Sequence, residues 1–65
     1  MNKADIGKAI AERRKTLGIS QGRLAELSGV AVHTISNLET GNGNITLETL
    51  IKVARTLGYR VSVGV

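Results

Sequence analysis

The 65-residue sequence contains no Cys, no Pro, no Trp and no Phe, and it has a single His, His33. Without Cys the chain forms no disulfide, and one His alone does not supply the ligands of a structural metal site. No apolar run approaches the roughly 18 to 20 residues that a membrane-spanning helix needs. The polar residues 1–5 lack the apolar core of a signal peptide. These absences predict a cytoplasmic protein without a cofactor, a metal or a membrane partner.

The sequence carries an excess of positive charge. Nine Lys and Arg residues against five Asp and Glu residues give a formal net charge of +4 and a pI near 10.2. Such an excess favours a polyanionic partner, because binding releases counterions from phosphates. A small domain also needs net charge for solubility, so charge alone leaves both explanations open. A chain of this length buries only roughly 60% of its unfolded surface, which favours stabilisation by a partner subunit.

Four glycines that follow apolar-periodic segments predict four short helices, because Gly readily adopts the left-handed conformation at a helix end. These are Gly18, Gly29, Gly41 and Gly58. The corresponding helices are expected over residues of about 5–17, 21–28, 32–40 and 47–57. Their apolar positions recur at spacings of three and four, so we expect the following side chains to point inward: Ile6, Ala9, Ile10, Leu17, Leu24, Leu27, Ile35, Leu38, Leu47, Leu50, Ile51, Ala54 and Leu57.

After Gly58 the apolar period changes to two, which is typical of a strand over residues 59–65. Its apolar face consists of Tyr59, Val61, Val63 and Val65. The chain offers no second strand, so we expect this segment to pair with its copy in a homodimer; a frayed tail is the alternative. No repeat or linker interrupts the chain, which predicts one all-α domain over residues 1–65 with a short C-terminal β-strand that pairs across the dimer.

Residues 20–40 have the pattern of a helix-turn-helix unit. Two short helices that cross steeply need a small residue at the crossing, a Gly in the turn and apolar residues that hold the second helix. Ala25 and Gly29 suit the first two roles, and Val30 and Ile35 suit the third. The outer face of the second helix then stays outside the core. A helix that is presented in this way fits the major groove of DNA.

The stretch from Ile10 to Leu57 resembles the Cro and lambda-repressor-like regulators of the XRE family. The matching residues are a basic first helix, Leu-Gly-Ile-Ser-Gln, Leu-Ala-Glu-Leu, Gly-Val, Thr-Ile-Ser-Asn-Leu-Glu-Thr-Gly, Thr-Leu-Glu-Thr-Leu and a final Leu-Gly. The resemblance implies a lambda-repressor-like four-helix fold and a nucleoid-associated transcriptional repressor. Such a repressor binds a palindromic operator in double-stranded DNA as a homodimer. The tail, Tyr-Arg-Val-Ser-Val-Gly-Val, is similar to the HipB-like antitoxin branch of the family.

The resemblance also implies which residues contact the bases. It places Val32 and His33 first, followed one turn later by Ser36 and Asn37. Val32 suits a thymine methyl group, His33 a base acceptor or a phosphate, and Asn37 an adenine edge. A surface Val and a solvated His are the alternatives. The sequence departs from the family at Val32, where Gln or Arg is commoner, and at Ala31, where a capping residue is usual.

Phosphate contacts are expected from a second set of residues. The resemblance assigns such contacts to Gln21 and to Arg14, which it pairs with Glu39. The alternatives are a polar first-turn residue for Gln21 and two exposed charges for Arg14 and Glu39. Arg23 either contacts a phosphate or is solvated. The loop after the third helix adds short polar side chains, although residues 41–44 are also typical of a flexible turn. These side chains are Thr40, Asn42 and Asn44.

The sequence contains no constellation of catalytic residues. The lone His33 has no neighbouring acid, and no paired carboxylates or phosphate-loop glycines are present. The chain is therefore predicted not to be an enzyme. The alternative function is that of an antitoxin that holds a toxin protein inactive and binds DNA for autoregulation.

Overall fold

The computed structural model describes residues 2–62 of the chain. Within this range it contains α1 (Lys3–Thr16), α2 (Gln21–Ser28), α3 (Val32–Thr40) and α4 (Leu47–Thr56). The prediction of an all-α fold of four helices is confirmed. Helix α1 begins earlier than predicted because the side chain of Asn2 caps it, accepting a hydrogen bond from the Asp5 N–H. None of these helices is long and apolar enough to cross a membrane.

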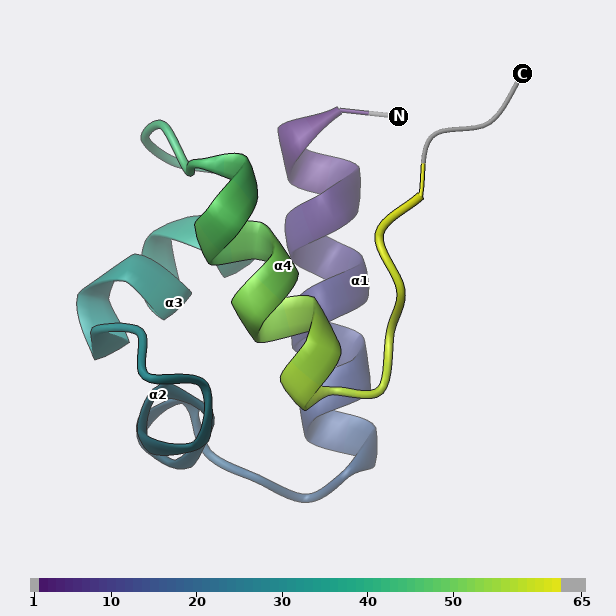
Figure 1. The fold of residues 1–65 in the computed structure, drawn as a ribbon, viewed down its shortest axis with the longest axis vertical. Helices are drawn as coiled ribbons and strands as arrows, with labels where there is room; N and C mark the ends of the chain where they lie inside the picture. The colour runs from purple at the N-terminus through teal and green to yellow at the C-terminus, as the bar shows by residue number, and fades with distance from the viewer. Residues whose placement is uncertain (1, 63–65) are drawn as a thin grey trace.

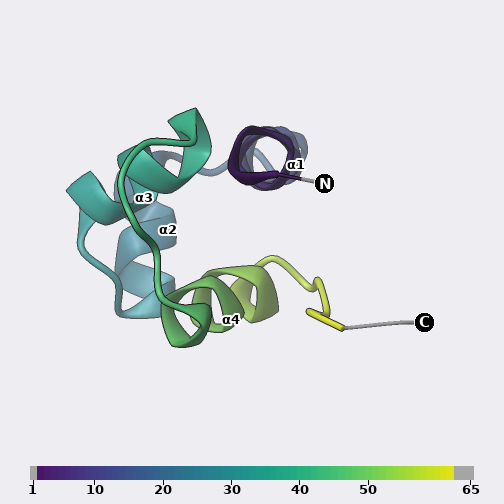
Figure 2. The same cartoon turned by 90° about the horizontal axis from the view of Figure 1, so that it is seen from above.

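The helices surround one apolar core. Figure 1 shows α4 in front of α1, with α2 and α3 to one side, and Figure 2 shows α1 and α4 on opposite sides of the molecule. Every helix contributes to the core, whose buried residues are Ile10, Leu24, Ile35, Leu38, Val53, Ala54 and Leu57. Because the core includes both helices of the predicted helix-turn-helix unit, α1 and α4 support the orientation of α2 and α3.

Glycines end the helices where the sequence predicts. Gly18, Gly29, Gly41 and Gly58 have φ angles of 71°, 72°, 77° and 80°. Gly29 is the C-cap of α2 and Gly41 is the C-cap of α3. A residue with a Cβ is strained in this conformation, so these two glycines end both helices sharply.

Helix α1 crosses the end of α3 at very short range. Gly7 is buried at this crossing, and a Cβ atom built there would overlap the Leu38 carbonyl oxygen and lie 2.8 Å from the Glu39 carbonyl oxygen. Only Gly allows the two backbones to approach this closely. The sequence pattern did not identify Gly7, which lies inside a helix.

Three leucines and Ala9, all predicted to point inward, are exposed. The exposed fractions of Leu17, Leu27 and Leu47 are 44%, 51% and 65%. On α2 the inward face consists of the buried Leu24 and of partly buried residues on either side, including Ala25 and Ser28. Leu27 lies beyond this face of the short helix. Leu47 is the first residue of α4 and lies beyond the core.

Helix α4 ends at Thr56, and beyond Gly58 the C-terminal segment follows an extended path in Figure 1. The Tyr59 N–H donates a hydrogen bond of 2.8 Å to the Ala54 carbonyl oxygen, and residues 59–62 take part in no strand pairing within the described chain. Val63 and Val65 of the predicted strand lie outside the described residues. Because the predicted pairing needs a second copy, the strand stays a prediction.

Candidate nucleic-acid interface

Helices α2 and α3 form the predicted helix-turn-helix unit. The N–H groups of Gly29 and Val30 both donate to the Ala25 carbonyl oxygen, which closes the turn at the end of α2. Leu24 and Ile35 have no exposed surface and lock the two helices onto the core. The opposite face of α3 is left outside the core.

The outer face of α3 presents the predicted base-contacting residues together. Val32 is 50% exposed, His33 and Asn37 are exposed, and Ser36 is partly buried. Their spacing along α3 places these four side chains on neighbouring positions of two successive turns. The structure thus brings the predicted set to one surface, and base contact by these residues stays a prediction.

A partly buried hydrogen-bond network joins α1, α2 and α3. Arg14 Nε lies 2.6 Å from Glu39 Oε2, and Arg14 Nη2 lies 2.9 Å from Glu39 Oε1. Arg14 Nη1 donates to the Ile19 carbonyl oxygen over 2.9 Å, and Gln21 Nε2 donates to Glu39 Oε1 over 3.0 Å. The side chains of Arg14 and Glu39 are only 12% and 5% exposed. The two-point pairing fixes their geometry, in contrast to an exposed ion pair.

The network also governs the ionisation of its members. Burial alone would raise the pKa of Glu39, but the hydrogen bonds from Arg14 and Gln21, together with the charges of Arg14 and Lys15, outweigh burial and lower this pKa. The hydrogen bond to Glu39 raises the pKa of Arg14, against the effect of burial. Both groups are therefore charged at neutral pH, and Glu39 offsets the positive charge of Arg14.

Two of the predicted phosphate contacts, Gln21 and Arg23, lie on α2. Gln21 is partly buried and uses one amide hydrogen on Glu39, so its second amide hydrogen is left for another acceptor. The side chain of Arg23 is 56% exposed, and its Nη1 lies 3.8 Å from Glu26 Oε2. A pair as exposed as this contributes about 0 to 1 kcal/mol, so Arg23 is held only weakly.

Three more predicted phosphate contacts lie at the end of α3 and in the loop that follows it, and they make different hydrogen bonds. Thr40 Oγ1 donates to the Ser36 carbonyl oxygen over 2.9 Å and accepts from Asn42 Nδ2 over 3.1 Å. Asn44 Oδ1 accepts from Lys3 Nζ over 2.9 Å. The loop is thus tied to α3 on one side and to α1 on the other.

Residues 10–63 match the family model described as helix-turn-helix. The chain belongs to the helix-turn-helix family. The restriction-modification controller protein C.AhdI from Aeromonas hydrophila, a solved structure, superposes with a TM-score of 0.81 and 32% identity. The match covers 88% of this chain and 83% of that one. This likeness confirms the lambda-repressor-like arrangement of the four helices.

Two sequence relatives belong to the same class of regulator. An uncharacterised helix-turn-helix transcriptional regulator of Haemophilus influenzae is 43% identical over 56 residues, which are 86% of this chain and 57% of that protein. The competence pilus inhibition repressor of Acinetobacter baylyi is 38% identical over 58 residues, which are 89% of this chain and 53% of that protein. The chain therefore spans little more than half the length of these two relatives. The helix-turn-helix family and the names of these relatives identify a regulator, in agreement with the prediction that the chain is not an enzyme.

The sequence pattern did not predict the contacts that two basic residues of α1 make. Lys3 reaches the loop after α3 from the first turn of α1. Arg13 donates from Nε to the Leu57 carbonyl oxygen over 3.0 Å and places its guanidinium 5.7 Å from the centre of the Tyr59 ring. Both contacts join residues that are 40 or more positions apart, and no local pattern in the sequence indicates them.

Proposed function

We propose that the chain is the DNA-binding domain of a sequence-specific transcriptional repressor that binds a palindromic operator as a homodimer. The observation that carries this proposal is the outer face of α3, which stays exposed while Leu24 and Ile35 anchor α2 and α3 to the core. The +4 charge of the chain supports a phosphate-rich partner. The name of the Acinetobacter relative, a repressor, supports repression.

On this proposal α3 enters the major groove, and its outer face reads the bases. The amide of Asn37 matches the paired donor and acceptor of adenine, and Val32 offers an apolar contact to a thymine methyl group. His33 and Ser36 contribute donors on the same surface. Phosphate contacts from Arg14, Gln21, Arg23 and the loop after α3 fix the position of the helix, and they carry little sequence information.

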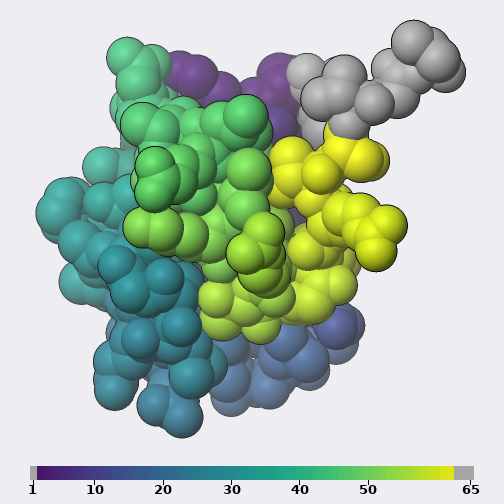
Figure 3. Space-filling view, in the orientation of Figure 1, coloured from purple at the N-terminus to yellow at the C-terminus, as the bar shows by residue number. Residues whose placement is uncertain are grey.

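The surface between α1 and α4 supports a second copy as the partner. An apolar groove lies there, lined by Ile6, Ala9, Ile10, Leu50, Ala54 and residues 59–62. Tyr59 and Val61 are 44% and 37% exposed beside it, and Figure 3 shows this segment on the surface next to α4. An antiparallel ribbon of two such segments covers the apolar side chains and satisfies the backbone of both copies. We expect this ribbon to place the two α3 helices about 34 to 36 Å apart, which is one turn of DNA.

Binding to DNA is tested with an operator selected from random duplexes. Affinity for that operator should fall steeply with salt. Asn37→Ala should weaken operator binding by about 1 to 3 kcal/mol and binding to random DNA by less. Thr16→Ala, an exposed polar position at the end of α1, is the matched control. An affinity that is independent of salt contradicts the function, and equal losses on both DNAs remove Asn37 from the base-contacting set.

Dimerisation through the tail is tested by sedimentation at micromolar concentration. The intact chain should be a dimer, and both a chain that ends at Gly58 and the full-length variant Val61→Glu should be monomers. If all three forms have the same oligomeric state, the ribbon is not the interface. The antitoxin alternative stays a prediction, because no contact among residues 2–62 bears on a toxin.

A further inference from the structure

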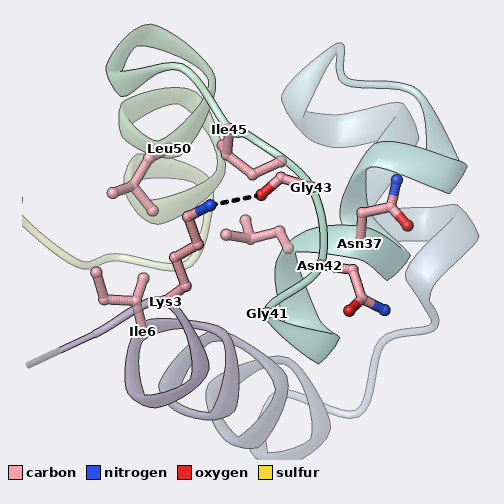
Figure 4. A pocket seen from close by; sticks show the side chains of 9 residues that line it. Lys3, Ile6, Asn37, Gly41, Asn42, Gly43, Ile45 and Leu50 are labelled. Atoms are coloured by element: carbon pink, nitrogen blue, oxygen red, sulfur yellow. Dashed lines mark hydrogen bonds between the residues drawn. The ribbon is translucent and has the colours of Figure 1, made fainter.

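Lys3 joins the start of α1 to the loop after α3. Its Nζ donates to the Gly43 carbonyl oxygen over 3.0 Å and to Asn44 Oδ1 over 2.9 Å. Figure 4 shows the side chain reaching from α1 to this loop across a small cavity of about 90 Å³. The ammonium group is thus held beside a loop that is expected to face DNA.

The positive charge of Lys3 has no counterpart in the part of the chain that the structure describes. The ion pairs there are Arg14 with Glu39, Arg23 with Glu26, and Lys52 with Glu48. Among residues 2–62, Lys3 donates only to neutral oxygens, and it is the first residue of α1, where the helix dipole disfavours a cation. Helix stability therefore does not account for a Lys at this position.

Some polar side chains at the loop after α3 already use their hydrogen-bond donors within the protein, and others do not. The Thr40 hydroxyl hydrogen is used on the Ser36 carbonyl oxygen, and Asn42 spends an amide hydrogen on Thr40. Asn44 instead accepts from Lys3 through Oδ1, which leaves both amide hydrogens of Asn44 to donate. Lys3 itself retains one of its three ammonium hydrogens. Two adjacent side chains thus carry free donors and a positive charge.

We propose that Lys3 and Asn44 together form a clasp for one backbone phosphate of DNA. The clasp extends the DNA contact from α3 to the N-terminal end of α1. Lys3 supplies the charge and, through its bond to Oδ1, turns the amide group of Asn44 outward as a donor. This inference rests on the proposed DNA-binding function, which it extends by a phosphate contact that includes Lys3.

The test is the salt dependence of operator binding by the full chain. Neutralising one phosphate contact should lower the slope of log affinity against log salt by about 1. We expect this loss for Lys3→Gln, with affinity about tenfold weaker in low salt, and we expect Lys3→Arg to keep the slope. Lys8→Gln, which removes the same charge from an exposed position of α1, is the matched control and should keep it too.

A second variant separates a phosphate contact from a purely structural tie. Asn44→Asp places a carboxylate next to Lys3, so the folded chain should be as stable as before or more stable, whereas DNA binding should weaken. Equal salt slopes for Lys3→Gln and Lys8→Gln, or unchanged affinity in Asn44→Asp, overturn the clasp alone. No binding by the unmodified chain overturns the DNA-binding function together with the clasp.

Discussion

Gln21 Nε2 donates a hydrogen bond of 3.0 Å to Glu39 Oε1, and this bond connects the first residue of α2 to the last turn of α3. The same carboxylate holds Arg14 at two points. Two residues that are expected to contact phosphates are thus positioned by one acid that itself would repel DNA. Glu39 is a positioning residue, and its contribution is stability and alignment.

Glu39→Gln should therefore destabilise the fold and weaken DNA binding. The change leaves the partly buried charge of Arg14 without its charged partner, which should cost about 1 to 3 kcal/mol, the range for a buried polar group that loses a hydrogen-bond partner. Urea unfolding followed by circular dichroism measures the loss. Glu12→Gln, at an exposed position of α1, is the control and should change the free energy of unfolding little. Similar unfolding midpoints for the two variants would show that the network contributes no stability.

The network also predicts a loss of stability in acid. The folded pKa of Glu39 is lowered, so its contribution is complete above the ordinary value of 4.5 and is lost as the pH falls through the lower folded pKa. The difference in unfolding free energy between the unmodified chain and Glu39→Gln should shrink from about pH 5 downward. Urea titrations at several pH values measure this difference. A difference that stays constant down to about pH 3 contradicts the prediction.

Gly7 and Gly22 should respond to Ala in opposite directions. Both lie in helices, but a Cβ at Gly7 meets the backbone of α3, whereas a Cβ at Gly22 lies 3.8 Å from Ser20 Oγ. Gly22→Ala should raise the free energy of unfolding by about 0.4 to 1 kcal/mol, because Ala restricts the unfolded chain. Gly7→Ala should lower the thermal midpoint, since α1 must move away from α3. An equal gain for both variants would mean that the close crossing is absent.

Ala31→Ser should stabilise the start of α3. Ala31 is the N-cap of α3 and provides no side-chain hydrogen bond, whereas Ser20 accepts from the Arg23 N–H over 2.9 Å at the start of α2. A Ser at the cap should add about 1 kcal/mol, and Ser20→Ala should remove a similar amount. Thermal unfolding of both variants measures the gain and the loss in stability. If Ala31→Ser brings no gain, the open N–H groups of α3 already have partners.

The local pattern of the sequence determined the four helices and most of their ends. The spacing of apolar residues and the glycines at helix ends both act over a few residues. The helix ends at Gly29 and Gly41 and the burial of Leu24 and Ile35 were therefore predicted correctly. The same reasoning identified the face of α3 that lies outside the core. These features depend on backbone conformation and helical period, which neighbouring residues specify.

Only the tertiary structure decided how the helices meet. The contact of Lys3 with Asn44, the close approach at Gly7 and the bond from Gln21 to Glu39 each join different helices or loops. The exposure of Leu27 was also decided there, because the inward face of α2 depends on the angle at which it packs. Crossing angles arise from the fit of whole side-chain surfaces, so residues that meet through them leave no periodic signal in the sequence.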